Sequence, residues 1–213
     1  MPNHVKNILT IEVAPKNVGK IFTEEEYAAM AHRPTTAEEE VEAVLDFIAQ
    51  TDEKYAEPKR GTIDFEKIVP MPEGIFRGNL DLKERRLYGE NNWYDWSVKH
   101  WGTKWNAYDF ESNEYYPNPI IFSTAWSAPY EIYEALAKKF PNLKFSVQYA
   151  DEDMGNNCGE ITYENGEFHD WEPGSDKEGM EFACQVWYGT SPDNCGYVYN
   201  KKTHTWEYAD WAE

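Results

Sequence analysis

The sequence predicts an α+β fold whose sheet is built from a split β-α-β arrangement. A strand–helix–strand pattern runs from 119 to 150, and a second one can be drawn through 5–13, 36–50 and 62–69. The chain of 213 residues is 41% hydrophobic and 16% aromatic, which is enough for a buried core. These patterns predict a fold, but by themselves they do not say what the protein does.

The later strand–helix–strand pattern is the clearest. Ile120–Trp126 is a largely apolar run typical of a strand. A helix should follow, with Ser127 as its N-cap and Pro129 in its first turn, where the missing N–H costs nothing. Leu143–Ala150 alternates apolar and polar residues, so we expect a second strand with one buried face.

The earlier pattern opens with a strand over 7–13. A helix is predicted from Thr23, which can form a capping box with Glu26, and it should end at Arg33-Pro34. The helix of the unit follows at 36–50, capped by Thr35 or Thr36, with three glutamates near its positive end. The simplest interpretation of these three glutamates is that they stabilise the helix N-terminus and lie on a face exposed to water.

The third member of the earlier unit is a predicted strand at 62–69. Pro70-Met71-Pro72 closes it, and this end should lie at an edge or in a loop because proline cannot donate to a ladder. The insertion between the two units then spans 71–118 and begins with a polar surface stretch at 74–90.

The insertion contains four tryptophans within 13 residues. Asn92 can cap a short helix that Gly102 ends, and the residues after it, 104–108, alternate like a strand. On the helix, three rings share one side and a fourth lies toward its edge. The rings could line a pocket, form an interaction surface, or make the core of the insertion. The candidate binding residues of this region are Trp93, Trp96, His100, Trp101 and Trp105.

Several short motifs are spread from residue 1 to about residue 168. They are Met1-Pro2-Asn3-His4-Val5, Val69-Pro70-Met71-Pro72, Trp93-Tyr94-Asp95-Trp96, Trp101-Gly102-Thr103-Lys104-Trp105-Asn106, Thr124-Ala125-Trp126-Ser127-Ala128-Pro129 and Tyr149-Ala150-Asp151-Glu152-Asp153. In this order they resemble the YubB-type ferredoxin-like domain family of phage, plasmid and pathogenicity-island proteins. The resemblance implies a ferredoxin-like fold and a mobile-element setting. It implies no functional residue, because that family has no established activity.

The chain departs from that family in two places. The helices of 23–50 are longer and more acidic than the family's, and the segment beyond about 170 has no counterpart in it. We therefore expect a ferredoxin-like domain over 1–168 and a β-rich extension over 169–213. A type I′ hairpin around Asn165-Gly166, a strand over 181–188 and a last hairpin near 200–202 would form that extension, with 172–179 as a polar loop.

The best candidate for a chemical site is the acidic loop after the second strand of the later unit. Its candidate binding residues are Asp151, Glu152, Asp153 and Asn156. A calcium loop starting at Asp151 would need glycine at 156 and glutamate at 162, and the chain has Asn156 and Thr162. A looser Mg²⁺ or Mn²⁺ site and a plain solvated loop both remain open.

The net charge of −19 is unevenly placed. Residues 23–57 carry 11 acids and 2 bases, and residues 145–213 carry 15 acids and 3 bases. Such a chain should not bind nucleic acid or an anionic membrane through a general basic surface, whereas a partner with a basic surface would suit it. The alternative explanation is that the negative charge serves only to keep the protein soluble. There is no long apolar run and no secretion signal, and three cysteines without a CxxC pair fit reduced thiols in the cytoplasm.

Three functions follow as hypotheses. The first is a non-enzymatic interaction protein of a mobile element, in its sharpest form a nucleic-acid mimic that binds a host protein. The second is a domain, or an enzyme, that binds a small ligand or a divalent metal through Trp93–Trp105 and Asp151–Asp153. The third is a structural role in a virion or plasmid complex. The sequence motifs indicate no catalytic residue, no cofactor and no assigned metal site.

Overall fold

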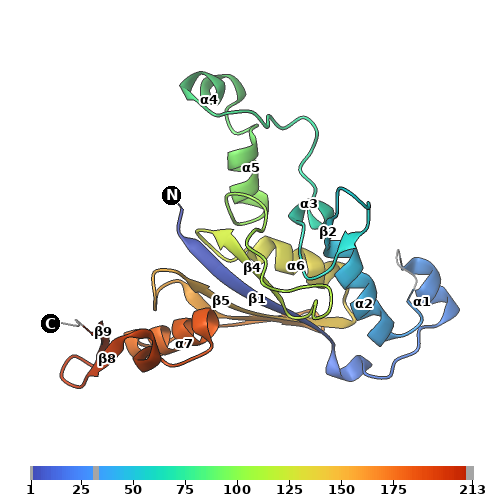
Figure 1. Ribbon diagram of the computed structural model, residues 1–213. Helices are drawn as coiled ribbons and strands as arrows, with labels where there is room; N and C mark the ends of the chain where they lie inside the picture. The colour runs from blue at the N-terminus through green and yellow to red at the C-terminus, as the bar shows by residue number, and fades with distance from the viewer. Residues whose placement is uncertain (1, 31–33, 210–213) are drawn as a thin grey trace.

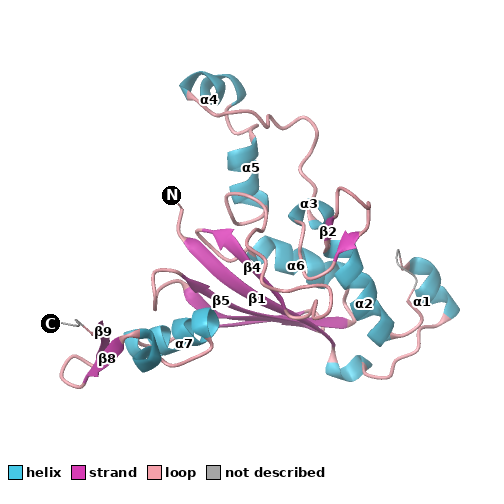
Figure 2. Ribbon diagram, in the orientation of Figure 1, coloured by secondary structure: helices cyan, strands magenta, loops and turns pink. Residues whose placement is uncertain are grey.

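A five-stranded antiparallel sheet organises the protein, whose computed structural model describes residues 2–30 and 34–209 (Figures 1 and 2). The strand order is β4-β1-β5-β6-β7. The strands are β1 (His4–Val13), β4 (Ile120–Ala125), β5 (Leu143–Asp151), β6 (Cys158–Glu164) and β7 (Glu167–Trp171).

The later predicted unit is confirmed as a split β-α-β unit. β4 leads through helix α6 (Tyr130–Lys139) into β5, and β1 lies between the two strands, antiparallel to both. Leu9 of β1 pairs with Ile120 on one side and Val147 on the other. The expected N-cap was wrong, because Pro129 occupies that position without a side-chain hydrogen bond. The Ser127 hydroxyl instead donates to the carbonyl oxygen of Gly102.

Helices α2 (Ala37–Ile48) and α6 cover one face of the sheet (Figure 1). The Thr36 hydroxyl accepts a hydrogen bond from the amide of Glu39, which confirms the predicted cap of α2. The shorter helix α1 (Glu24–Ala29) begins with the predicted capping box between Thr23 and Glu26. Its predicted end at Arg33 lies outside the described residues. The fully buried side chains between sheet and helices include Leu9, Ile11, Leu45, Ile48, Phe122, Ile132, Tyr133, Leu136 and Phe145.

The strand expected at 62–69 was wrong. Helix α3 (Phe65–Ile68) takes its place, because the carboxylate of Asp64 accepts from the amide of Glu66 and begins a helix. The earlier β-α-β unit therefore lacks its second strand. The short strands β2 (Gln50–Thr51) and β3 (Pro58–Lys59) pair only with each other. The edge of β4 is covered instead by the backbone around Tyr108 and Glu111, which bonds to Ser123 and Ile121 at 2.7–3.1 Å.

The insertion forms an arm that projects from the sheet (Figure 1). Helix α5 (Trp93–His100) is its stem, capped by Asn92 as predicted, and helix α4 (Leu82–Tyr88) is its tip. The expected strand at 104–108 was wrong, since this segment is a loop with a single bridge from Tyr108 to Ser123.

The other face of the sheet is covered in part by helix α7 (Asp176–Tyr188), where the sequence predicted a polar loop followed by a strand (Figure 1). The hydroxyl of Ser175 caps this helix, and Gly189 ends it in the left-handed conformation. Ala183 and Val186 of α7 pack with Ala150 and Cys158 of the sheet. The C-terminal extension is therefore a helix followed by a hairpin and is not mainly β.

Two predicted hairpins are confirmed. β6 and β7 are joined by Asn165 and Gly166, whose φ angles of 56° and 82° are those of a type I′ turn. After the 3-10 turn Pro192–Cys195, β8 (Tyr197–Asn200) pairs with β9 (Thr205–Tyr208). A further 3-10 turn, Pro15–Asn17, follows β1.

Candidate functional site

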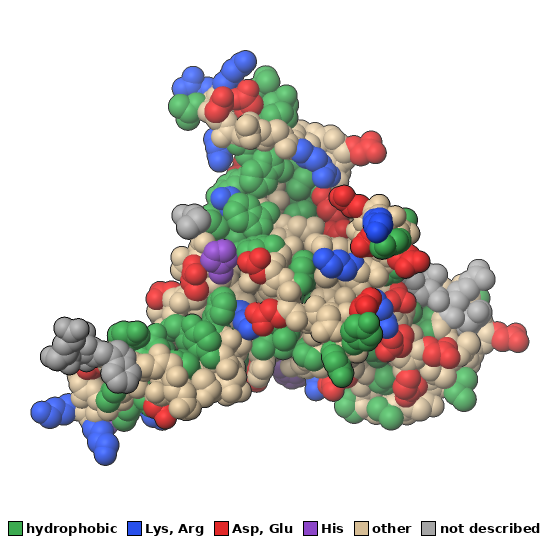
Figure 3. All heavy atoms as spheres, viewed as in Figure 1, with side chains coloured by type: hydrophobic (Ala, Val, Ile, Leu, Met, Phe, Trp, Pro, Cys, Tyr) green, Lys and Arg blue, Asp and Glu red, His purple; other side chains and the backbone are tan. Residues whose placement is uncertain are grey.

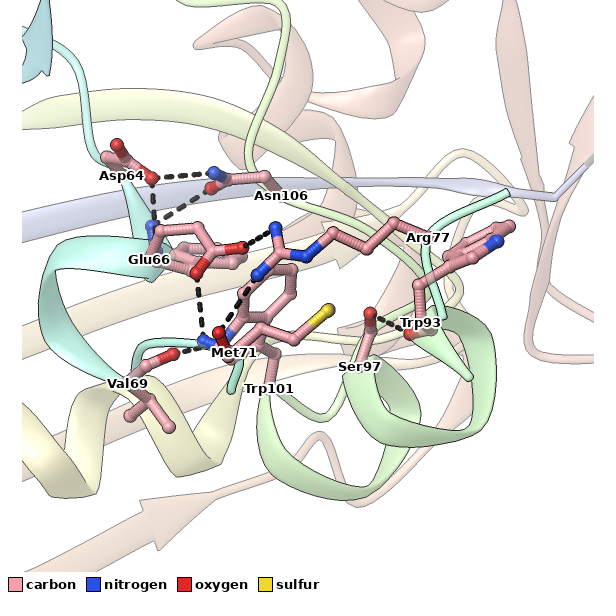
Figure 4. A network of polar contacts seen from close by, with 10 residues as sticks. Asp64, Glu66, Val69, Met71, Arg77, Trp93, Ser97, Trp101 and Asn106 are labelled. Carbon is pink, nitrogen blue, oxygen red and sulfur yellow. Dashed lines mark hydrogen bonds and ion pairs between the residues drawn. The ribbon is translucent and has the colours of Figure 1, made fainter. Parts of the chain in front are cut away.

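Trp101 of the Trp-rich segment belongs to the core. Its side chain is only 4% exposed, and its indole Nε1 donates to the carbonyl oxygen of Val69 at 2.8 Å (Figure 4). Its ring packs edge-on against Phe65, with 5.9 Å between centroids. Of the three explanations for the tryptophans, a core role is the right one for this residue.

A polar network fixes the start of the insertion beside Trp101 (Figure 4). The carboxylate of Glu66 accepts from the Arg77 guanidinium at 3.0 Å and from the amide of Met71 at 2.8 Å. The same guanidinium donates to the carbonyl oxygen of Met71 at 2.9 Å. These contacts join α3 to the segment that leads into the arm.

Trp93, Trp96 and His100 lie half-buried on the stem of the arm. The Trp96 and His100 rings stack with centroids 4.6 Å apart, and both line a surface hollow of about 630 Å³ with Asp95 and Lys99. The indole of Trp93 faces elsewhere and donates to the carbonyl oxygen of Gly78 at 3.0 Å. The hollow is open to solvent, whereas a dedicated small-molecule site is usually a deep cleft.

Trp105 lies at the end of the sheet where β1 begins and β4 and β5 end. Its ring packs against Tyr108, whose hydroxyl is 2.7 Å from Nδ1 of His4. Lys104 lies over the rings of Trp105 and Trp126, at 4.5 and 5.2 Å from their centroids. Burial, with help from nearby carboxylates, raises the pKa of Tyr108 to about 12, so this phenol stays protonated at neutral pH.

The acidic loop lies at the same end of the sheet, and Asp151 is its structural centre. This carboxylate is 4% exposed and accepts hydrogen bonds from Asn3, Asn157 and the amide of Asp153 at 2.9–3.1 Å. Glu152 accepts from the amide of His4 at 3.0 Å. The structure thus brings Tyr108 and Glu152 into contact with His4, and Trp105 reaches this group through its packing on Tyr108.

The other two loop residues hold the turn. The carboxylate of Asp153 accepts from the Asn156 side chain at 3.2 Å. Within residues 2–30 and 34–209, no group of three His, Cys, Asp or Glu side chains could hold a metal ion. The carboxylate of Asp153 holds the turn of the loop, and that of Asp151 also ties the loop to the residue before β1.

Several acids of the N-terminal stretch, mainly along α2, are engaged within the chain. Glu38 accepts from the amide of Gly19 and Glu39 from Thr35, which lowers the pKa of both carboxyls. Arg60 forms ion pairs with Glu42 and Asp46. Figure 3 shows acidic side chains beside α1 and α2, and basic ones at the tip of the arm.

The three cysteines are free thiols. Burial raises the pKa of Cys158 to about 11 and that of Cys184 to about 12, the latter with a further contribution from neighbouring Cys195. A thiol that is protonated at neutral pH is a poor nucleophile, so these two residues are packing residues.

Among the residues that the structure describes, none pairs with the outer edge of β7, and the sequence did not predict this open edge. All five residues of β7 are exposed, and β7 is the last strand of the sheet. The strand carries the acidic side chains of Glu167 and Asp170, and Glu164 lies opposite Glu167 on β6. The hairpin itself was predicted, but its position at the edge depends on the strand order, which the sequence pattern does not contain. This edge is a candidate binding site in addition to the hollow lined by Trp96 and His100.

Comparison with known proteins places part of this chain in context. Residues 100–190 match the family model described as the ferredoxin-like domain in Api92-like protein. This part of the chain resembles that domain. The matched residues include β4, α6, β5, β6, β7 and α7, and therefore the split β-α-β unit and the uncovered edge. No curated protein and no solved structure matches the chain.

The α+β, ferredoxin-like part of the prediction is thus supported both by the family match and by the sheet. In the described ranges, none of the helices has the length and apolar character needed to span a bilayer.

Proposed function

We propose that the protein is a non-enzymatic interaction protein that binds a partner with a basic surface through its acidic C-terminal part. The observation that carries this proposal is β7, an edge strand with every residue exposed. It lies within residues 145–213, where acids outnumber bases by 15 to 3. An uncovered edge offers backbone hydrogen bonds, and the surrounding charge selects partners of opposite sign.

The acids at the β7 edge suit this function better than those along α2. A nucleic-acid mimic needs carboxylates that are free to meet a basic groove, whereas Glu38, Glu39 and Glu42 already bind groups of their own chain. In contrast, Asp170 has no ion pair among the described residues, and Glu167 pairs only with His169, at 3.6 Å. We therefore propose that any nucleic-acid mimicry uses the acids at the β7 edge, among them Glu167 and Asp170.

The setting we propose is the cytoplasm of a host cell that carries a phage or plasmid. The motif resemblance to YubB-type proteins supports the mobile-element origin, and the three free thiols suit a reducing compartment. A host protein with a basic surface is the proposed partner.

A pull-down from host lysate at low and high salt, read by mass spectrometry, tests the proposal. The wild-type chain should capture a basic protein that is lost as salt screens the charges. A variant with Glu164→Gln, Glu167→Gln and Asp170→Asn should capture much less. A matched control with Glu24→Gln, Glu25→Gln and Glu53→Gln has the same net charge and should behave like wild type. Equal capture by both variants, or a blank for wild type, would refute the proposed surface.

A second candidate function is small-ligand binding at the hollow lined by Trp96 and His100. The stacked pair offers a flat aromatic face, and the hollow of about 630 Å³ is large enough for a nucleotide-sized molecule. A nucleotide that raises the melting temperature of wild type but not of a Trp96→Ala variant would support it. No shift for either protein would count against it.

A further inference from the structure

The two edges of the sheet differ in how their backbone groups are satisfied. Along β4, Tyr108 and Ser123 exchange hydrogen bonds at 2.7 and 3.1 Å. Along β7, the type I′ turn makes Glu164 and Glu167 a hydrogen-bonded pair, so pairing with β6 alternates from there. Phe168 and Asp170 therefore direct their N–H and C=O groups away from β6. No described residue bonds to these groups, so a further strand has room to pair here.

An apolar groove runs beside this edge, between α6 and the β6–β7 hairpin. Its volume is about 240 Å³. A cavity of about 150 Å³ holds a benzene ring, so this groove has room for one aliphatic or aromatic side chain. Phe168 is 46% exposed and packs against Tyr163, with ring centroids 4.9 Å apart. The apolar lining residues are Ala137, Pro141, Leu143, Tyr163 and Phe168.

The surroundings of the groove are acidic. Three carboxylates line the groove, two more, Asp170 and Glu172, lie in and just after the edge strand, and the lysine that lines the groove, Lys138, is paired with Glu134 at 2.7 Å. Burial raises the pKa of the Tyr163 phenol to about 12, with smaller contributions from Glu134, Glu131 and Asp170. The three lining acids are Glu134, Glu164 and Glu167.

We propose that this edge binds an extended, lysine- or arginine-rich segment of the partner by strand addition. The segment pairs with the outward groups of Phe168 and Asp170. It places one apolar side chain in the groove and its cations against the acidic surroundings. Alternating side chains of an extended segment allow both contacts at once. This inference rests on the proposed function and names the partner's chemistry.

A second copy of the chain is a poor occupant of the same edge. Two β7 strands would bring the acidic side chains of one copy close to those of the other, and like charges that lie close together across strands are destabilising. The acidic side chains on the edge thus prevent self-pairing while they attract a basic segment.

The test uses the full chain and two fluorescein-labelled ten-residue peptides, with fluorescence anisotropy as the readout. One probe alternates valine and lysine, and the other alternates valine and glutamate. We expect the lysine probe to bind at low salt and the glutamate probe not to bind. Replacing Asp170 with proline removes an outward donor without touching a bond to β6 and should weaken binding at least about tenfold. Ala137→Phe, which fills the groove, should weaken it by a similar factor.

A charge-matched pair of variants separates this site from general attraction to an acidic protein. The lysines of the probe alternate with its valines and so lie on the face opposite the groove, where Glu167 and its cross-strand partner Glu164 also lie. Glu164→Gln with Glu167→Gln should weaken binding of the lysine probe at least about fivefold, and Glu24→Gln with Glu25→Gln, far along the chain, should change it less than about twofold. Equal losses in the two variants would overturn the proposal. So would Asp170→Pro binding like wild type, or a wild-type dimer that Asp170→Pro dissolves. If both probes fail while the pull-down succeeds, the strand-addition site falls and the interaction function stands.

Discussion

Replacing Trp101 with alanine should lower the free energy of unfolding by about 3–5 kcal/mol, as for other large aromatic residues removed from a core. The side chain is 4% exposed, packs on Phe65, and donates to the carbonyl oxygen of Val69. The substitution removes buried apolar area and leaves that oxygen without its partner. Urea unfolding followed by circular dichroism measures the change.

Leu82→Ala is the matched control for that experiment. Leu82 lies on α4 at the tip of the arm and is 76% exposed, so its loss should change stability by less than about 0.5 kcal/mol. If Trp101→Ala unfolded at the wild-type urea concentration, Trp101 would not be the core residue that its contacts indicate.

Replacing Asp151 with alanine should lower the free energy of unfolding by roughly 2–4 kcal/mol, because one buried carboxylate serves three donors. The donors from Asn3 and Asn157 join the start of β1 to the loop after β5. Thermal and urea unfolding both measure the loss.

Asp153→Ala is the control because Asp153 lies in the same turn. Its carboxylate is exposed and accepts a single side-chain hydrogen bond, from Asn156. It should cost less than about 1 kcal/mol. Millimolar Mg²⁺ or Ca²⁺ should leave the melting temperature of all three proteins unchanged. A divalent-ion stabilisation of wild type that disappears in Asp151→Ala would instead show that this loop is a metal site.

The sequence could predict those elements whose signals are local. The later β-α-β unit, the caps at Thr36 and Asn92, and the type I′ turn at Asn165-Gly166 are each specified by neighbouring residues. Helix α7 was missed because Phe182, Cys184 and Val186 alternate as they would in a strand. The N-cap Ser175 and the left-handed Gly189 were the signals that could have identified a helix.

The candidate sites were harder to predict because they depend on contacts between distant parts of the chain. An acidic loop after a strand gave no sign that Asn3, 148 residues earlier, would bond to Asp151. Alternation around Phe65 suggested a strand, yet the side chain of Asp64 begins a helix there. The exposure of β7 follows from the strand order alone, and no local pattern records that order.

Pairing of a basic segment with β7 would protect the outward amides of this strand. Amide hydrogen exchange, followed residue by residue by NMR with and without the valine–lysine probe, measures that protection. The probe should slow exchange at Phe168 and Asp170 by at least about tenfold, with little change at Glu167 and His169, which already pair with β6. Protection elsewhere, with Phe168 and Asp170 exchanging as before, would contradict the claim.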